Sequence, residues 1–193
     1  MLLILLTLFI GFQIYTTVST NKSNAQPYQV EWRMKDFEIR FYPSSTMATI
    51  TSSAKSYKEL GSSGFKKLAG YIFGGNETQQ KIAMTSPVHM TINDSASTMS
   101  FVMPTQFNKE NLPQPNDNSV VIKTTSDEYV AAMTFGGFAS DADIKRNTEK
   151  FENALKTASI TYHGNFRYLG YNPPYQLFGR RNEIIVGVNW VAK

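Results

Sequence analysis

FEIRFYPSSTMATITS, residues 37–52, is the stretch that decides the fold. Its β-branched and aromatic residues are typical of a strand. YQVEWR, residues 28–33, precedes it and reads as a second strand, joined to the first at Lys35–Asp36, a pair that favours a turn. Strands joined by so short a turn indicate antiparallel pairing. A helix is predicted next, from about residue 56 to residue 72, ending at Gly74–Gly75–Asn76.

Two more predicted strands follow the helix, and the pattern then repeats after a link rich in Pro and Asn, residues 105–118. The second predicted helix runs from about 141 to 158 with Ser140 as its N-cap. The order β-β-α-β-β therefore occurs twice, in halves at about 27–104 and 119–191. The strands outside the opening stretch are KIAMTSPVHMTI, TMSFVMP, SVVIKTT, YVAAMTFGG, NFRYLGY and NEIIVGVNWV.

This repeat predicts an α+β fold, with duplicated β-β-α-β-β halves forming a distorted antiparallel barrel or curved sheet. Two main helices are expected on the outside, because two helices are too few to cover both faces of a large sheet. Two similar halves leave a groove where they meet, which is a usual place for a ligand.

The N-terminal segment is predicted to be a targeting sequence instead of part of the fold. Residues 2–18 are almost continuously apolar, and the first charge in the chain is Lys22. The residues Ser23–Ala25 resemble a cleavage site, so 1–25 is a signal peptide or a retained membrane anchor. Either alternative places the single domain at 26–193 outside the cytoplasm, with the membrane involved only through an uncleaved segment.

Composition and motifs favour a binding protein over an enzyme. The net charge is +4 with basic residues scattered in ones and twos, so we expect no nucleic-acid binding. The chain has no cysteine, which removes disulfides and thiolate sites, and no GxSxG, Walker A, GxGxxG or HExxH pattern occurs. The two histidines, His89 and His163, lack the carboxylate spacing of a zinc site, and no structural metal is expected.

Several separate motifs resemble the SOUL haem-binding protein family, in family order over about residues 27–190. They are YIFGGN (71–76), KIAMTSPV (81–88), FVMP (101–104), LPQPND (112–117), FGGFASDADI (135–144) and TYHGNFRYLGYNPPYQLFGRRNEIIVGV (161–188). The resemblance implies a distorted barrel that binds haem or a related porphyrin non-covalently in an apolar surface groove. It implies no reaction, so we expect a non-enzymatic monomer that transports, stores or buffers the ligand. Two alternatives stay open, a binder of lipids or amphipathic cations and a protein-interaction module.

The resemblance also implies that the first helix flanks the groove. On the face of that helix away from its apolar residues, Gly70 would let a flat ring approach the backbone, and Tyr71 could stack on it. Lys67 could pair with a propionate. The alternative is a solvated helix face, with Gly70 a packing contact.

The loop NPPYQLFGRRNE is the proposed second wall. Two prolines stiffen it, and its apolar side chains are Tyr175, Leu177 and Phe178. Arg180, Arg181 and Glu183 are candidate propionate contacts. The favoured alternative for Arg181 and Glu183, which share a strand face, is a structural ion pair. Some relatives carry a basic residue where this chain has Gln176, which weakens a propionate clamp at that position.

KIAMTSPVHM, residues 81–90, contains candidate metal ligands of its own. Alternation along a strand places Met84 and Met90 on the apolar face and His89 on the other face. The Met and His side chains are therefore not expected to bind one metal together. His89 is the better of the two histidines as a possible axial ligand of haem iron, while His163 is expected in an exposed loop.

Overall fold

The stretch that decides the fold, residues 37–52, forms two strands where its sequence predicts one. In the computed structural model, which describes residues 2–22 and 25–191, these strands are β2 (Glu38–Tyr42) and β3 (Thr46–Ser52). The break falls at Pro43, which fixes its own backbone and has no N–H to donate. Beyond the break, Ser45 accepts a hydrogen bond of 2.9 Å from the backbone of Thr125.

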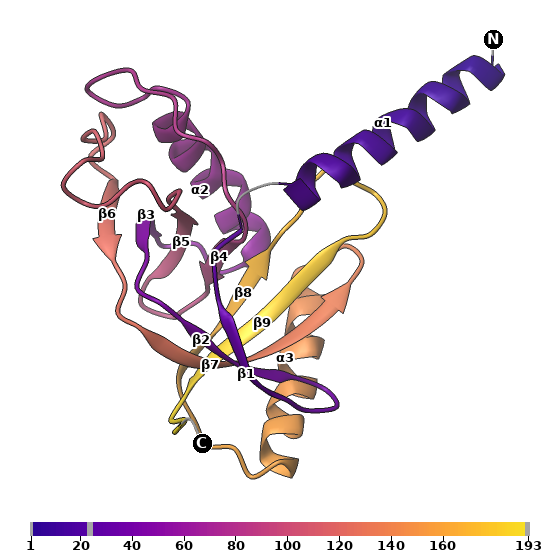
Figure 1. Cartoon of the computed structure of the whole chain (residues 1–193), viewed down its shortest axis with the longest axis vertical. Coiled ribbons are helices and arrows are strands. Elements are labelled where there is room, and N and C mark those ends of the chain that lie inside the picture. Colours follow the sequence, from indigo (N-terminus) through magenta and orange to yellow (C-terminus); the bar gives the residue numbers. More distant parts are fainter. Residues whose placement is uncertain (1, 23–24, 192–193) are drawn as a thin grey trace.

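A second pair of consecutive strands runs beside β2 and β3. This pair consists of β6 (Val120–Thr124) and β7 (Glu128–Gly136). Strand β7 pairs with β2 and β6 pairs with β3, both antiparallel. Strands of the first half therefore pair with strands of the second half at these two places in the sheet. This pairing, shown in Figure 1, joins the two halves into one sheet.

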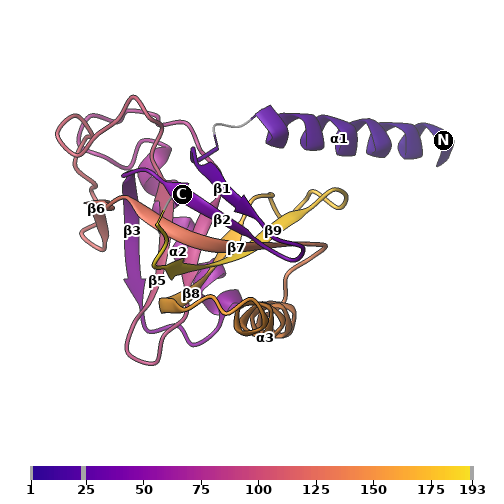
Figure 2. The ribbon, with the colours of Figure 1, turned by 60° about the horizontal axis from the view of Figure 1, so that its bottom comes forward.

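The sheet of the described residues is antiparallel and open. Its order is β1-β2-β7-β9-β8-β4-β5-β3-β6, with β1 and β6 at the edges. The order β7-β9-β8 on one side of the β8–β4 contact is mirrored by β4-β5-β3 on the other, which confirms the predicted duplication and the curved antiparallel sheet (Figure 2). The remaining strands are β1 (Gln29–Arg33), β4 (Val88–Thr91), β5 (Ser97–Val102), β8 (Tyr162–Gly170) and β9 (Arg181–Val188).

The two main helices lie where the sequence predicts them. They are α2 (Tyr57–Ile72) and α3 (Asp141–Thr157), and α3 begins with a capping box formed by Ser140 and Asp143. Helix α2 packs on β3 and β5, and α3 packs on β8 and β9. Each helix thus covers its own half of the sheet.

Strand β9 shows how the sheet separates its two faces. Ile184 and Val186 belong to the apolar cluster under α3. Ile185 belongs to a different cluster, with Tyr42 and Leu169, on the opposite face. Because side chains alternate along a strand, Glu183 also points to that opposite face, where it is buried.

The stretch 81–90 corrects part of the sequence interpretation. Only Val88–Thr91 is strand, so the register predicted for Met84 is wrong, and Met84 is 39% exposed in the preceding loop. Met90 lies in the core with α2, as predicted. His163 lies in strand β8, although it was predicted to lie in a loop, and it is exposed. The β4 ladder begins just after Pro87, which has no N–H to pair.

Helix α1 (Leu2–Lys22) extends from the domain as an arm (Figure 1). No helix in the part of the chain that the structure describes is both long and apolar enough to cross a membrane. Ser23 and Asn24, which belong to the predicted cleavage site, lie outside the described residues.

Two glycines of α2 provide a matched test of its packing. A Cβ at Gly64 would lie 2.7 Å from Ile50 Cδ1, whereas a Cβ at Gly70 would meet nothing within 4 Å. Gly70→Ala is expected to raise the free energy of unfolding by about 0.5–1 kcal/mol through helix propensity. Gly64→Ala is expected to lower it by about 1 kcal/mol through overpacking. Urea unfolding measures both, and equal shifts would contradict the packing described.

Candidate ligand-binding site

The loop between β8 and β9 presents an apolar surface. Tyr175 is 56% exposed, Leu177 41% and Phe178 66%, so the three side chains predicted for the second wall all lie on the outside of the loop. Arg180 Nη1 fixes the loop from within, donating to the carbonyls of Pro173 at 2.8 Å and Gln176 at 2.7 Å. The loop is therefore a shaped platform with its apolar side chains facing outward.

Arg180 carries a charge that no carboxylate balances. Five of the six arginines form ion pairs, and Arg180 forms none with the described residues. Its Nε is buried without a hydrogen-bond partner, and its guanidinium stacks 4.5 Å from the ring centre of exposed Phe138. Burial lowers the pKa of the Arg180 guanidinium, because desolvation disfavours the charged form. An anion would relieve that cost.

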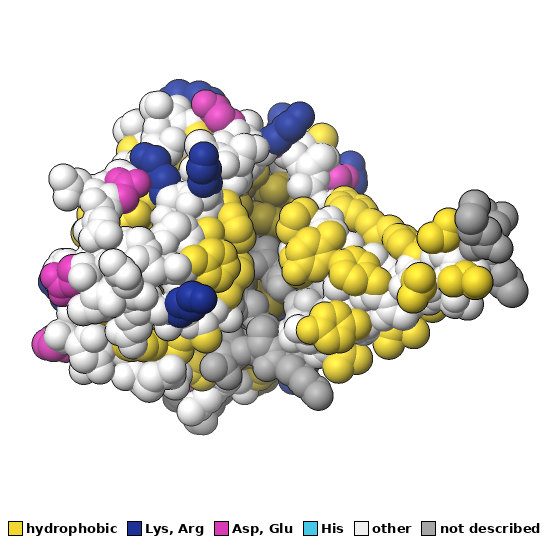
Figure 3. All heavy atoms as spheres, turned by 90° about the horizontal axis from the view of Figure 1, so that it is seen from above, with side chains coloured by type: hydrophobic (Ala, Val, Ile, Leu, Met, Phe, Trp, Pro, Cys, Tyr) yellow, Lys and Arg dark blue, Asp and Glu magenta, His cyan; other side chains and the backbone are white. Residues whose placement is uncertain are grey.

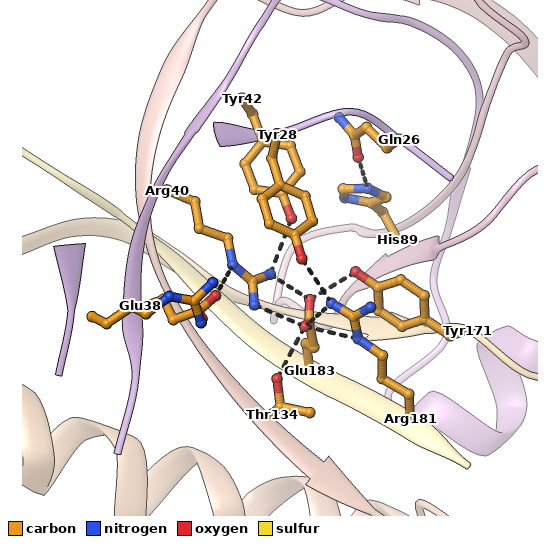
Figure 4. A network of polar contacts seen from close by, with 11 residues as sticks. Gln26, Tyr28, Glu38, Arg40, Tyr42, His89, Thr134, Tyr171, Arg181 and Glu183 are labelled. Atoms are coloured by element: carbon orange, nitrogen blue, oxygen red, sulfur yellow. Dashed lines mark hydrogen bonds and ion pairs between the residues drawn. The ribbon is translucent and has the colours of Figure 1, made fainter. Parts of the chain in front are cut away.

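The base of the loop is held by a buried carboxylate, Glu183. Its oxygens accept two hydrogen bonds from Arg40, at 2.9 and 3.0 Å, and two from Arg181, at 3.1 and 2.6 Å. Thr134 and Tyr171 donate two more, at 3.0 and 2.7 Å (Figure 4). The expected pairing of Arg181 with Glu183 is confirmed.

The ionisation of this cluster follows from its geometry. Burial favours protonated Glu183, but the hydrogen bonds and charges of Arg40 and Arg181 outweigh it and hold the pKa of Glu183 below its usual value. Burial also raises the pKa of Tyr171, whose hydroxyl donates to the carboxylate. Glu183 is thus ionised and fully occupied, and it is a structural anchor instead of a free ligand.

Helix α1 packs on the outer side of the same loop. Gln13 donates to the carbonyl of Tyr175 at 3.2 Å and accepts from the backbone N–H of Leu177 at 2.9 Å. The rings of Phe12 and Tyr175 lie 6.0 Å apart. Between the helix and the loop runs an apolar trough of about 270 Å³, lined by Phe9, Ile10, Gln13, Ile14, Thr17, Val18 and Phe178.

The residues predicted on α2 are not brought together with the loop by any bond. Lys67 Nζ lies 3.1 Å from Ser119 Oγ, at the start of β6, and Gly70 faces open space. Tyr71 was assigned to the exposed face but lies in the core, where its hydroxyl donates to the carbonyl of Pro113 at 3.0 Å. Among the described residues, no hydrogen bond, ion pair or ring contact joins these positions to the loop.

The surface between α1 and the body of the domain is nevertheless hollowed (Figure 3). Figure 3 shows apolar side chains along the α1 arm and a second apolar group on the body of the domain, facing each other across a hollow. Lys and Arg side chains lie near its margin. An apolar hollow with cations at the rim suits a flat, apolar ligand that carries carboxylates.

His89 is buried on the face of the sheet that holds Glu183. Its Nε2 lies 2.7 Å from Gln26 Oε1 (Figure 4). Burial lowers the pKa of His89 to about 3, and the charge of Arg167 contributes in the same direction. The imidazole is neutral at physiological pH, and to bind an iron through Nε2 it would have to give up Gln26.

Sequence reasoning missed the residues that position the loop from a distance. Arg40 lies 143 positions before Glu183, and Gln13 lies 164 before Leu177. Gln13 does carry a signal, because it is the one amide in the apolar run of residues 2–18. Arg40 carries none beyond its place in a strand.

The fold and the site define a class, an α+β ligand-binding domain whose open sheet carries an apolar loop and an unbalanced cation. The family described as SOUL heme-binding protein matches residues 23–187, and the chain belongs to that family.

Relatives agree with this assignment, and one solved structure shares the fold. Heme-binding protein 1 of Xenopus laevis is 30% identical over 156 residues, covering 77% of this chain and 81% of that protein. Heme-binding protein 2 of Mus musculus is 26% identical, with 82% and 80% covered. The crystal structure of the EcmrR C-terminal domain shares the fold, with a TM-score of 0.62 at 8% identity, covering 85% of this chain and 99% of that one.

The low pKa of His89 predicts a stability loss in mild acid. The pKa is about 3 in the folded chain and about 6.5 when unfolded, so the unfolded chain takes up the proton first. The contribution of neutral His89 to the free energy of unfolding is fully present above pH 6.5 and is lost as the pH falls from there toward 3. Between pH 6.5 and 5 the slope is expected to approach about 1.4 kcal/mol per pH unit.

His89→Leu is expected to be less stable than the wild type near pH 7, because Gln26 loses its partner. It should lack this slope, so its deficit relative to the wild type should shrink as the pH falls. His163→Gln, which alters the exposed histidine, serves as the control and should keep it. Urea unfolding at a series of pH values measures all three proteins. Equal slopes for the wild type and His89→Leu would show that His89 does not titrate in this way.

Proposed function

We propose that the chain binds haem or a related tetrapyrrole non-covalently, without catalysing a reaction, to transport, store or buffer it. The observation that carries the proposal is Arg180, a guanidinium with an unsatisfied Nε and no carboxylate partner among the described residues. A tetrapyrrole combines a flat apolar ring with propionates. The apolar loop and Arg180 meet both requirements at one place. The names of the relatives support the same ligand.

In this proposal the residues of the loop contact both the tetrapyrrole ring and one of its propionates. Phe178, Leu177 and Tyr175 contact the ring, and Arg180 pairs with a propionate. Lys67, Gly70 and Tyr71 stay predictions for the opposite wall, with Tyr71 required to leave the core before its ring could stack. Bound haem would supply an iron centre, and the protein would supply apolar contact and charge.

The iron is proposed to need no ligand from the described histidines. His89 is buried against Gln26, and breaking that contact would leave a buried polar group unpaired. Axial ligation by His89 therefore stays a secondary prediction. A visible spectrum of hemin unchanged by His89→Leu, at unchanged affinity, would remove it.

Hemin titration of the whole chain tests the function. Saturable binding with a shifted Soret band is expected, and a spectrum equal to that of free hemin would reject the proposal. A lipid or amphipathic cation that displaces hemin with equal ease would favour a general binder of apolar ligands. Absence of binding by any of them at micromolar concentration would favour a protein-interaction module.

The domain is also proposed to act outside the cytoplasm, as a monomer. The uncharged N-terminal run and the absence of cysteine support this placement. Fractionation of cells followed by sedimentation of the purified chain tests both statements. Recovery of the chain inside the cytoplasm, or as a stable oligomer, would contradict them.

Arg180→Gln is expected to weaken hemin binding about 10- to 100-fold, as for loss of a charged hydrogen bond worth roughly 1.5–3 kcal/mol. Because Arg180 also fixes the loop, the decisive comparison uses hemin dimethyl ester, in which the propionates carry no charge. The wild type should bind hemin more tightly than the ester, and Arg180→Gln should bind both equally.

Arg146→Gln is the matched control, since Arg146 is exposed on α3 and pairs with Asp143. Its preference for hemin over the ester should equal that of the wild type. If Arg180→Gln keeps the full preference, Arg180 does not contact a propionate.

A further inference from the structure

Helix α1 is apolar almost all the way round, except for one polar stripe. The stripe consists of Gln13, Thr16, Thr17 and Thr20, at helical spacing. Gln13 and Thr16 are buried, and Thr17 and Thr20 are half-buried. Every other side chain described between residues 4 and 20 is exposed. The helix is therefore inverted relative to an ordinary surface helix, because its buried side chains are polar and its exposed ones are apolar except for Thr7 and Ser19.

The stripe is bonded to the candidate ligand loop. Gln13 bridges the carbonyl of Tyr175 and the N–H of Leu177, and Thr20 donates to Gln176 Oε1 at 2.8 Å. Gln176 is buried and donates from Nε2 to the carbonyl of Phe178 at 2.9 Å. These hydrogen bonds reach the loop along its apolar segment, residues 175–178. Helix α1 is therefore held on the loop by specific polar contacts and not by apolar contact alone.

The outward surface of α1 is large and almost entirely apolar, with the hydroxyls of Thr7, Tyr15 and Ser19 as its few polar groups. The hydroxyl of Thr7 bonds within the helix to the carbonyl of Ile4 at 2.8 Å, and Thr16 and Thr17 both bond to the carbonyl of Gln13 at 2.9 Å. No side chain in residues 1–21 is charged. The exposed large apolar residues are Ile4, Leu5, Leu6, Leu8, Phe9, Ile10, Phe12, Ile14, Tyr15 and Val18.

We propose that α1 is retained in the mature protein, lies against a lipid surface, and holds the ligand loop there through its polar stripe. This inference rests on the proposed function for the identity of the loop as a ligand wall. Its consequence is that a tetrapyrrole dissolved in the lipid exchanges directly with the loop, without passing through water.

Lipid fits this surface better than a second copy of the chain. A partner helix covers one stripe of a helix and would leave the rest of this apolar circumference in water. Lipid covers the whole outward apolar surface, and at the interface its polar headgroups meet the exposed hydroxyls of Tyr15 and Ser19. Because residues 2–21 of α1 carry no charged side chain, with Lys22 only at its last position, binding requires no anionic lipid.

Flotation with vesicles tests the lipid contact. The full chain, with its N-terminus verified by intact mass, is expected to float with vesicles of pure phosphatidylcholine. Leu5→Glu/Leu8→Glu, which places charges at positions 57% and 65% exposed, should stay at the bottom of the gradient. Lys58→Glu/Lys66→Glu, which also introduces two glutamates, on α2, and changes the net charge by twice as much, is the control and should float.

Hydrogen exchange tests the docking. Gln13→Leu keeps α1 apolar but removes the acceptor of the Leu177 amide, so exchange at Leu177 should accelerate about 3- to 10-fold, as for one hydrogen bond. Thr7→Val, which alters a hydroxyl bonded only within the helix, should leave Leu177 unchanged. Vesicles loaded with hemin should transfer it faster to the wild type than to Leu5→Glu/Leu8→Glu.

Three results would overturn this inference: a mature chain that begins after residue 22, a full chain that does not float, or equal exchange at Leu177 in Gln13→Leu and the wild type. A stable oligomer that ignores vesicles would identify a second copy as the occupant. None of these results affects the titration of hemin in solution, so a failure here is distinguishable from a failure of the proposed function.

Discussion

The six hydrogen bonds accepted by Glu183 fix the part of the molecule on which the site depends. Tyr171 and Arg181 stand at the two ends of the loop, and both bond to this one carboxylate. Arg40 joins the Glu183 carboxylate to β2, and Thr134 joins it to β7, so the ends of the loop are held to strands from both halves of the fold. A buried ion pair adds little net stability, but removing one partner costs roughly 3–5 kcal/mol. The cluster therefore specifies position more than it adds stability.

Two adjacent arginines have different surroundings because β9 begins between them. Arg181 is the first residue of β9, and it stacks 4.2 Å from the ring centre of Tyr171 and is neutralised by Glu183. Arg180, one residue earlier, belongs to the loop, stacks on Phe138 and meets carbonyls but no carboxylate among the described residues. Arg181 is thus a structural cation, and Arg180 is a cation available to a ligand. Because Arg181 is anchored by Glu183, it also keeps the adjacent Arg180 in place.

Local chemistry was predictable from the sequence, and contacts distant in sequence were not. The N-cap at Ser140, which bonds to Asp143, and the pairing of Arg181 with Glu183 involve residues two or three apart, and both were predicted. Tyr71 was misplaced because helical spacing does not say how far the sheet and the loop at Pro113 wrap around α2. The division of residues 37–52 does have a local signal in Pro43, which the sequence interpretation passed over. What the sequence could not give is that β2 and β3 then take separate partners, β7 and β6, which lie about 80 residues away.

The N-terminal helix shows how one polar residue changes the meaning of an apolar run. An apolar run without a polar residue would make no specific contact with the domain, so nothing would fix its position. Gln13 offers a donor and an acceptor on one side chain, and the loop between Tyr175 and Leu177 presents one carbonyl and one N–H that match them. In lipid such an amide is costly unless it is paired, so docking on the loop becomes the favourable arrangement. The feature that makes the run imperfect as an anchor is therefore the feature that directs it to the ligand loop.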